Sequence, residues 1–167
     1  MTDANKMTDP PKIRQSPRPA FDDVPEGRRR NLAAVKGRDT TPEMIVRRLL
    51  HSMGYRFRLQ RCDLPGRPDV VLPRRRVVID VRGCFWHHHE DPSCKNAALP
   101  RTRSEWWASK LARNVQRDEA NQKALEVAGW RVLVLWECEV RRGGDELTRR
   151  LIQFLGPGTR SGRGGPP

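Results

Sequence analysis

The amino-acid sequence predicts a mixed α/β domain in which helices flank a small central mixed β-sheet. Three patterns predict this class. They are an apolar stripe at helical spacing in residues 40–53, two short apolar runs at 69–72 and 77–81, and a long amphipathic segment followed by the apolar run 130–136. The chain has 167 residues, which suits one domain with tails. We expect the order helix, three strands, helix, strand, helix.

The first helix is predicted from its N-terminal signal. Thr40 can cap a helix in which Glu43 occupies the third position, an arrangement known as a capping box. Gly54 is expected to end this helix. After it, apolar and polar side chains alternate through residues 55–60, which predicts a half-buried strand.

A β-hairpin is predicted next. The strand Asp69–Leu72 and the strand Val77–Val81 are separated by a short basic turn, and the second strand is apolar enough to be central. The two strands carry Asp69 and Asp80. Folding of the hairpin should therefore bring these two carboxylates together.

The C-terminal half is predicted to hold a long helix, a strand and a final helix. The long helix should run from about Ser104 to Ala128, with an inner face of Trp107, Leu111, Val115 and Leu125 and with Gly129 at its end. Residues 130–136 are expected to form a buried strand that delivers Glu137 and Cys138 at its end. Asp145 is expected to cap a last helix that continues through Leu155.

Both ends of the chain are predicted to be tails. Residues 1–27 contain prolines and scattered charge without apolar periodicity, and residues 156–167 are rich in Gly, Pro and Arg, so both segments are expected to be disordered. Residues 28–38 form a basic arm in which Leu32 and Val35 are either core residues or DNA contacts. The folded domain is therefore expected to span residues 28–155.

Charge and composition narrow the class of partner. The chain has 33 Lys and Arg against 20 Asp and Glu, a formal net charge of +13, which indicates a polyanion such as nucleic acid. The plainer alternative is a solvated basic surface. No apolar run is long enough to span a membrane, and the N-terminus has no secretory signal. Cysteines beside histidines are typical of metal ligands in a reducing compartment, so we expect the cytosol.

The segment Gly83–Cys94 is the most unusual in the sequence. It holds two of the four cysteines, three of the four histidines and the pair Phe85-Trp86. Thiolates and imidazoles together favour zinc, and a closed site of three cysteines and one histidine is structural. Cys84, Cys94 and Cys138 are the candidate cysteines, whereas His87, His88 and His89 are all candidates from spacing alone. The alternative is a set of unrelated buried thiols. Cys62 is expected to be a free thiol.

Two acidic motifs suggest a second metal site. Pro68-Asp69 and, after ten intervening residues, Asp80-Val81-Arg82 follow the layout of the PD-(D/E)xK nucleases, with Arg82 at the usual position of lysine. Paired carboxylates bind Mg²⁺, which activates water and stabilises charge on phosphorus. Asp80 and Arg82 lie two residues apart and share one face of their strand. The alternative for Asp80 is a charge that only pairs with an arginine.

Adjacent aromatic residues occur twice, as Phe85-Trp86 and Trp106-Trp107. Exposed aromatic side chains in a basic protein can stack on bases or enter between base-pair steps. The alternative for each tryptophan is that it fills the core.

With these motifs in order, the chain resembles the very-short-patch-repair (Vsr) family of DNA mismatch endonucleases. The resemblance runs from about Asn31 to Val140. It is carried by the blocks Arg38–Thr40, Leu64–Asp69, Gly83–His89, Leu99–Trp107, Lys110–Val115, Gly129–Leu133 and Trp136–Cys138. It implies a restriction-endonuclease-like core with a zinc-stabilised loop.

The resemblance also implies roles for residues at the active site. Asp69 matches the carboxylate that holds Mg²⁺, His87 matches the general base, and Glu43 matches an acidic residue that supports the site. The structural zinc ligands of the family match Cys84, His89, Cys94 and Cys138.

Other matched residues imply contacts with DNA. Phe85, Trp86 and Trp107 match the aromatic residues that enter DNA beside the mismatch. Lys110 and Asn114 match polar residues that contact the mismatched pair. The basic arm, with Leu32 and Val35, matches a segment that inserts from the opposite groove.

The sequence departs from a well-known family form at two places. Four residues separate His89 and Cys94, where that form has one, so the zinc loop is longer. Asp80, Val81 and Arg82 stand where that form has Phe, Thr and His. Val81 can still offer its backbone carbonyl to Mg²⁺, and Arg82 could replace the histidine. A further hypothesis is that Asp80 restores a second metal carboxylate.

The function implied is that of a Mg²⁺-dependent enzyme that nicks duplex DNA 5′ to the thymine of a T:G mismatch. Such mismatches arise from deaminated 5-methylcytosine, so a DNA cytosine methyltransferase is the expected companion. We expect a monomer in the bacterial cytosol, with no membrane association. The alternatives are a sequence-specific restriction-type nuclease on the same fold and a non-catalytic zinc DNA-binding module.

Overall fold

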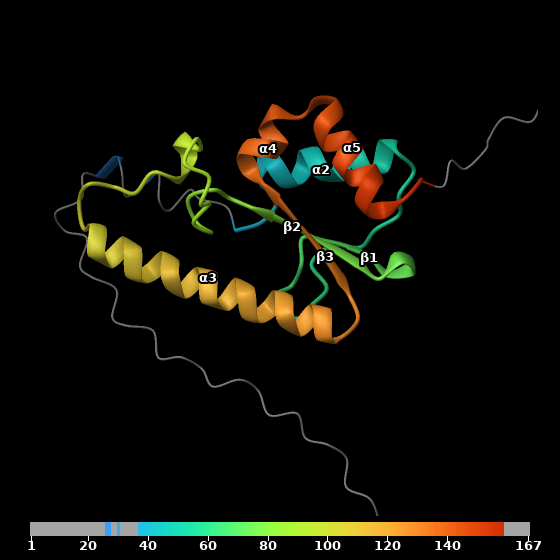
Figure 1. Cartoon of the computed structure of the whole chain (residues 1–167), viewed down its shortest axis with the longest axis horizontal. Coiled ribbons are helices and arrows are strands. Elements are labelled where there is room, and N and C mark those ends of the chain that lie inside the picture. Colours follow the sequence, from blue (N-terminus) through green and yellow to red (C-terminus); the bar gives the residue numbers. More distant parts are fainter. Residues whose placement is uncertain (1–25, 28–29, 31–36, 159–167) are drawn as a thin grey trace, which may run out of the picture. The chain divides into compact units, whose positions relative to one another are not determined.

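A computed structural model describes residues 26–27, 30 and 37–158 of the chain (Figure 1). Contacts divide the chain into two units, residues 1–36 and residues 37–167. The fold below is that of the second unit. The expected tails, apart from residues 26–27 and 156–158, and the arm residues Leu32 and Val35 lie outside the described residues. Within the described part, no helix combines the length and the apolar character that a membrane crossing requires.

The described unit contains a three-stranded sheet with β2 (Val77–Arg82) at its centre. β1 (Val70–Leu72) pairs antiparallel with β2, and β3 (Arg131–Trp136) pairs parallel with β2 on the other side. The predicted small mixed sheet and its central strand are therefore confirmed. A short 3-10 turn, Pro73–Arg75, closes the hairpin.

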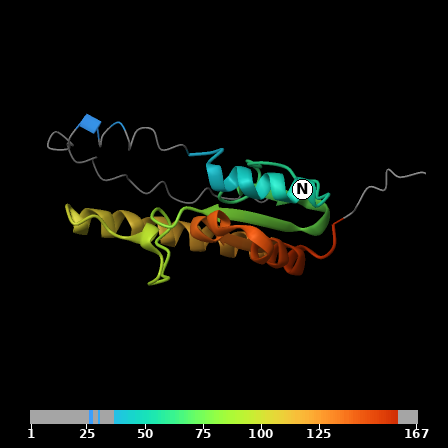
Figure 2. The ribbon, with the colours of Figure 1, turned by 90° about the horizontal axis from the view of Figure 1, so that it is seen from above.

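Helices cover both faces of the sheet, as Figures 1 and 2 show. One face packs against α2 (Thr41–Ser52), α4 (Glu137–Arg142) and α5 (Gly144–Leu155), and the other packs against α3 (Ser104–Val127). Alternation along β2 explains this division, because successive strand residues point to opposite faces. Ile79 belongs to the cluster under α2 and α5, whereas Val78 packs with Leu125 of α3.

The start of α2 confirms the predicted capping box. The Glu43 carboxylate accepts a hydrogen bond from the Thr40 hydroxyl at 2.8 Å and one from the Thr40 N–H at 3.4 Å. Glu43 is 4% exposed, so the cap is also part of the interior. The helix ends with Met53 at its C-cap, and Gly54 follows with a φ of +82°, which glycine adopts without strain.

The predicted strand at residues 55–60 is wrong. Only one bridge forms there, between Arg58 and Val71, and Gln60 then turns the chain with a φ of +43°. β1 is three residues long, so it offers little edge for a further strand. Tyr55 is nevertheless buried in the main core, which explains the apolar pattern.

The C-terminal half differs from expectation in two elements. The segment 137–142, for which no element was expected after the strand 130–136, forms the short helix α4, whose Glu139 carboxylate accepts a hydrogen bond from the Trp136 N–H at 3.4 Å. Asp145 does not cap the last helix. α5 starts at Gly144, so Asp145 lies inside its first turn, where a negative charge still suits the helix dipole.

The strand before α4 is also less buried than predicted. Only Leu133 and Leu135 of β3 are buried, and Arg131 at its start is exposed. α3 matches its predicted range closely, and of its predicted inner face Leu111 and Leu125 are fully buried while Trp107 and Val115 are half-buried.

The central strand should dominate stability. Ile79 is fully buried in the larger core cluster, so Ile79→Ala should destabilise the protein by about 2–5 kcal/mol through lost contacts and a cavity. Val127→Ala, at a side chain that is 82% exposed, should change stability by less than about 0.5 kcal/mol. Urea unfolding of both variants measures the difference. Equal midpoints would show that the strand is not central to the folded state.

Candidate active site and metal cluster

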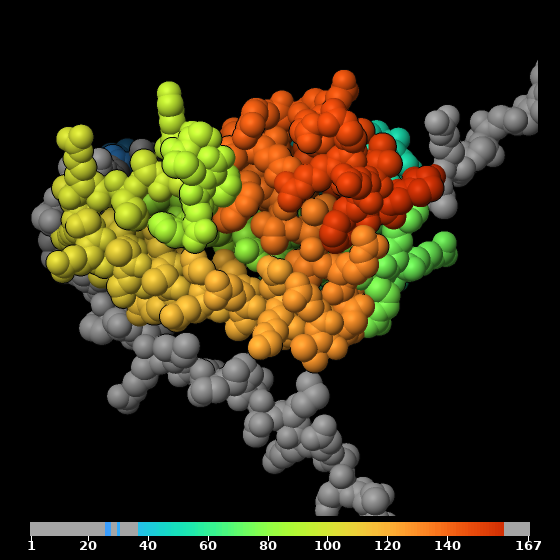
Figure 3. Space-filling view, viewed as in Figure 1, coloured from blue at the N-terminus to red at the C-terminus, as the bar shows by residue number. Residues whose placement is uncertain are grey.

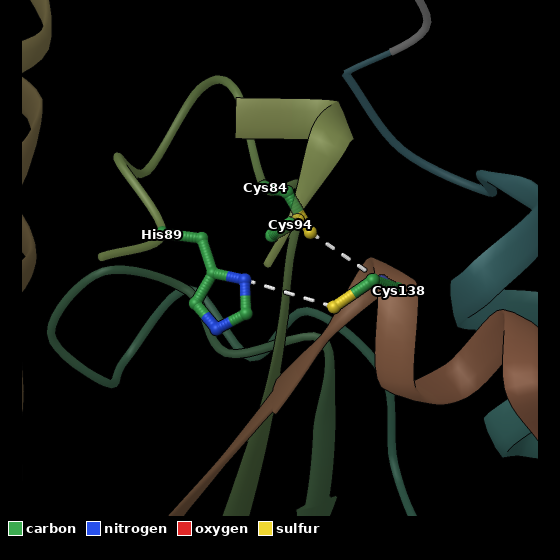
Figure 4. Close-up of side chains that lie close together, drawn as sticks. All are labelled: Cys84, His89, Cys94 and Cys138. Atoms are coloured by element: carbon green, nitrogen blue, oxygen red, sulfur yellow. Dashed lines mark hydrogen bonds between the residues drawn. The ribbon is translucent and has the colours of Figure 1, made fainter. Parts of the chain in front are cut away.

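Three cysteines and one histidine converge at one end of the sheet (Figure 4). The ligand atoms of Cys84, His89, Cys94 and Cys138 all lie within 4.8 Å of one another. The sheet explains how Cys138 reaches the others. β2 and β3 are parallel and in register as far as Arg82 and Trp136, so the residues that follow them emerge side by side. The Cys138 N–H donates a hydrogen bond to Cys84 Sγ at 3.4 Å.

The structure selects one histidine from the three candidates. His89 Nδ1 lies 3.6 Å from Cys138 Sγ, and its ring stacks on Trp136 with centroids 4.2 Å apart. His87 instead contacts Asp118, and His88 is exposed. The backbone supports this choice, because the His89 N–H donates to the Cys84 carbonyl at 2.9 Å and brings both ligands into one turn. Cys62 is exposed and does not belong to the cluster.

The cluster has the donor atoms that could hold a metal ion. The pKa of the Cys84 thiol is raised to about 12, chiefly by burial and also by the neighbouring thiols Cys94 and Cys138, although the Cys138 N–H opposes the rise. A thiol that ionises this reluctantly is a poor ligand until a metal ion supplies the compensating positive charge. Three sulfur atoms and an imidazole nitrogen are a donor set that a soft divalent ion accepts.

A second group of residues surrounds Asp69, just before β1. Asp69 Oδ2 accepts a hydrogen bond from the Val81 N–H at 2.8 Å, which fixes the carboxylate against the central strand. The pKa of Asp69 is raised to about 7, chiefly by burial and also by the negative charges of Glu43 and Asp80, while the Val81 hydrogen bond and the charge of Arg47 oppose the rise. Asp80, the other carboxylate of the predicted hairpin, is therefore among the groups that raise the pKa of Asp69.

Asp80 and Arg82 project from the same face of β2, as their spacing predicts. Arg82 Nη2 lies 3.7 Å from Asp80 Oδ2 and 3.4 Å from Gln122 Oε1 of α3. Burial raises the pKa of Asp80, while the Arg82 charge opposes that rise. This ion pair with an arginine is what the alternative interpretation of Asp80 predicted. Asp80 nevertheless lies on the central strand, and Asp118 and His87 both act on its pKa.

His87 forms a pair with a residue that sequence analysis missed. Its Nδ1 atom is hydrogen-bonded to the Asp118 carboxylate on α3. Burial opposes ionisation of Asp118, yet the hydrogen bond and charge of His87 hold the pKa of this carboxyl below its usual range. Both members also act on the pKa of Asp80, which Asp118 raises and His87 lowers. The pair thus borders the carboxylate group.

The helical spacing of Asn114 and Asp118 could have indicated that Asp118 belongs to the site. Asn114, which was predicted to contact DNA, lies one turn earlier on α3, and residues four apart share a helix face. Asn114 Nδ2 donates to the Trp86 carbonyl at 3.0 Å, while Asp118 contacts the adjacent His87. One face of α3 therefore holds two consecutive residues of the loop.

The four aromatic side chains form one cluster with a lysine above it. Phe85 lies 5.1 Å, between ring centroids, from both Trp86 and Trp107, and Trp106 lies 4.8 Å from Trp107. The Lys110 ammonium lies 5.0 to 5.8 Å from the three indole rings. All four aromatic residues are half-buried, so none is an ordinary core residue. In Figure 3 the loop and the start of α3 adjoin on the surface.

The raised pKa of Asp69 predicts a pH-dependent cost to stability. The folded protein holds this proton between about pH 4 and pH 7, where the unfolded chain releases it, so the stability contribution falls as pH rises through that window. Asp69→Asn removes the charge but keeps an acceptor for the Val81 N–H. Without added Mg²⁺, the variant should exceed the parent in stability at about pH 8 by on the order of 2–4 kcal/mol, and by less at about pH 5.5.

Urea unfolding at the two pH values measures this difference. The matched control is Asp145→Asn, at an exposed carboxylate, which should change stability little at either pH. Equal stability of Asp69→Asn and its parent at the higher pH would contradict a strained carboxylate.

Comparison with known proteins gives one consistent result. Residues 22–94 match the family model described as DNA mismatch endonuclease Vsr. The chain is 48% identical over 133 residues to the type II nicking enzyme V.XorIIP of Xanthomonas oryzae pv. oryzae, covering 80% of this chain and 95% of that protein. It is 45% identical over 121 residues to the DNA mismatch endonuclease Vsr of Escherichia coli, covering 72% and 75%.

A more distant relative agrees. The type II nicking enzyme V.NmeAIP of Neisseria meningitidis is 36% identical over 123 residues, which cover 72% of this chain and 86% of that protein. High identity over most of both chains, together with the family match, supports a single assignment. This chain belongs to the Vsr family of DNA mismatch endonucleases.

Proposed function

We propose that this protein nicks one strand of duplex DNA on the 5′ side of the thymine in a T:G mismatch. The observation that carries the proposal is the His87–Asp118 pair beside the carboxylates of Asp69 and Asp80. The relatives, a mismatch endonuclease and a nicking enzyme, agree with this reaction. The net charge of +13 suits a DNA substrate.

The group around Asp69 fits Mg²⁺. Carboxylate oxygens of Asp69 and Asp80 and the backbone carbonyl of Val81 are hard donors of the kind this ion prefers. The raised pKa of Asp69 supports the fit, because a cation would relieve the crowding of negative charge. When bound, Mg²⁺ would supply an activated water and stabilise charge on the phosphate. We assign the domain to the restriction-endonuclease-like fold on this arrangement.

His87 is proposed as the general base. Its Nδ1 atom faces Asp118, which would hold the ring in the tautomer that leaves Nε2 able to accept a proton from water. Asp118 thus orients the imidazole and stabilises the imidazolium that forms. Arg82, beside Asp80, is proposed to contact the phosphate in place of the histidine that a well-known family form has at this position.

The cysteine and histidine cluster is proposed as a structural zinc site. With four protein ligands, no position would remain for water or substrate, so the ion would fix the loop rather than react. The clamp would set the position of His87, which lies between the ligands Cys84 and His89 in sequence.

Mismatch recognition is proposed for the aromatic cluster and the adjacent face of α3. Phe85, Trp86 and Trp107 would enter the duplex beside the mismatch, where a wobble pair costs less to unstack than a Watson–Crick pair. Lys110 and Asn114 would contact the mismatched bases. Deamination of 5-methylcytosine creates such mismatches, so a DNA cytosine methyltransferase is the expected partner in function. The cytosolic location stays a prediction.

The first test compares nicking of matched and mismatched DNA. With Mg²⁺, purified protein should nick a labelled T:G duplex and leave the T:A duplex of the same sequence intact. Asp69→Ala should abolish nicking but retain DNA binding, since the carboxylate is proposed to hold the metal. Equal cutting of both duplexes would favour a restriction-type nuclease. Binding without any nicking by the parent protein would favour a non-catalytic module.

The proposed base and its orienting carboxylate give a second prediction. His87→Ala should lower the single-turnover nicking rate by about 10²–10⁴-fold, and Asp118→Asn should lower it by at least about tenfold, because proton transfer and ring orientation are both lost. Duplex affinity should change little. His88→Ala, at an exposed neighbour, is the matched control. A His87→Ala rate equal to that of the control would remove the assignment of the base.

Metal content gives a third prediction. Purified protein should contain one zinc ion per chain, measured by elemental mass spectrometry. Cys138→Ser should lose zinc and thermal stability together, because the clamp joins the loop to the end of β3. Cys62→Ser, at the exposed thiol outside the cluster, should keep both. A zinc-free parent protein that remains folded and active would contradict the structural site.

A further inference from the structure

Trp106 is the one residue of the aromatic cluster to which no role has yet been given. It lies on α3, where residues four apart share a helix face. Steps of four from Trp106 lead to Lys110, Asn114 and Asp118, which all have proposed roles in mismatch contact or catalysis. Trp106 therefore begins the row of side chains on which the proposed site depends.

The Lys110 ammonium lies over the faces of three indole rings. Its nitrogen is 5.0 Å from the ring centroid of Trp106, 5.7 Å from that of Trp86 and 5.8 Å from that of Trp107. A ring face attracts a cation within about 6 Å of its centroid. Side chains on a helix lean toward its N-terminus, so Lys110 covers the turn that carries Trp106 and Trp107. Trp106 is the nearest of the three rings.

The rings hold Lys110 without occupying it. Among the described residues, no hydrogen bond or ion pair engages the ammonium. An ammonium has three donors, and a carboxylate partner would take up one or more of them. Ring faces attract the charge and leave the donors on the far side available. Lys110 is therefore held in place and still able to donate to another molecule.

The three rings differ in what DNA binding would do to them. Trp86 and Trp107 are proposed to enter the duplex, and a ring face stacked on a base is no longer available to the ammonium. Trp106 has no such role and shares α3 with Lys110. It meets Trp107 edge-on, with ring centroids 4.8 Å apart and planes at 80°. Its own face can therefore stay against Lys110 after the other two rings have moved.

We propose that Trp106 is a positioning residue that holds the Lys110 ammonium on its ring face and thereby sharpens the choice of T:G over T:A pairs. This role rests on the proposed function, which it deepens. An ammonium only donates, so it suits T O4 and G O6 and is a poor partner for the amino group of adenine. A fixed ammonium makes that difference count, whereas a mobile one contacts phosphates of either duplex.

Trp106→Leu removes the ring and keeps an apolar side chain. The affinity ratio of a T:G duplex over the T:A duplex of the same sequence should fall at least about threefold, while T:A affinity stays within about twofold, because the charge remains. Fluorescence anisotropy measures both in the Asp69→Ala background, which is expected to bind without nicking. Phe154→Leu is the matched control. It removes a ring 4.5 Å from the Arg131 guanidinium and should leave the ratio unchanged.

Lys110→Met shows whether the ring acts through the ammonium. In this background Trp106→Leu should lower the affinity ratio little further, because the contact is already lost. Trp106→Phe should lower the ratio less than Trp106→Leu does, since a weaker ring face remains. A ring that itself stacked on DNA would cost T:G affinity in either background. A merely structural ring would lower thermal stability, and both affinities alike, without changing the ratio.

Nuclear magnetic resonance of the free protein tests the contact without DNA. The ε-methylene protons of Lys110 should resonate upfield of those of the exposed Lys123, because ring currents shield protons above an indole face. Trp106→Leu should remove most of that upfield shift. Loss of the resonance in Lys110→Met assigns it.

Three results would overturn the role of Trp106. They are an unchanged affinity ratio in Trp106→Leu, additive effects of Trp106→Leu and Lys110→Met, and Lys110 resonances at the position of those of Lys123. If Trp106→Leu does not fold, the resonance in the parent and the reduced ratio expected of Trp106→Phe decide. A parent protein without preference for T:G would defeat the proposed function, yet the Lys110 resonance would still show whether Trp106 holds the ammonium.

Discussion

The parallel pairing of β2 with β3 is the constraint on which the rest of the site depends. Because the strands run in the same direction and remain in register to Arg82 and Trp136, both chains leave the sheet at one edge. The loop after β2 and the first residues of α4 therefore meet, and Cys84 comes within hydrogen-bonding distance of Cys138. Ligands separated by more than fifty positions in sequence become neighbours through backbone geometry alone.

The same edge also brings chemistry-bearing side chains together. Val81, near the end of β2, donates its N–H to Asp69, which lies just before β1, and His87 follows in the loop that carries Cys84 and His89. α3 then supplies Asp118 and Asn114 from the opposite side. The sheet, the loop after β2 and α3 thus contribute to one place, and α3 contacts the loop at Trp86 and His87.

Much of this could be predicted from local sequence. The hairpin, the capping box of α2 and the long helix α3 follow from patterns contained within a few residues. The cysteine and histidine cluster was identifiable because three ligands lie close together and the fourth follows a strand. The choice of His89 over its neighbours depended on which way each side chain turns, and spacing does not determine this.

The wrong or missing predictions concern features that local sequence alone does not determine. Residues 55–60 alternate like a strand, but a strand also needs a partner edge, and β1 is too short to provide more than one bridge. Asp118 lies within a helix full of charged residues, so nothing local distinguishes it until His87 is placed beside it. The short helix α4 was missed because its six residues carry too little periodicity to separate them from a strand end.

The distribution of charge explains why metal and DNA binding should depend on each other. A chain of net charge +13 attracts a polyanion over its surface, yet the site gathers Glu43, Asp69 and Asp80 at the point proposed for cleavage. A phosphate brought to bare carboxylates would be repelled at short range. A divalent cation removes that repulsion and at the same time lowers the cost of ionising Asp69. On the proposed function, the buried acids therefore keep the attractive surface from holding DNA productively until the cation is bound.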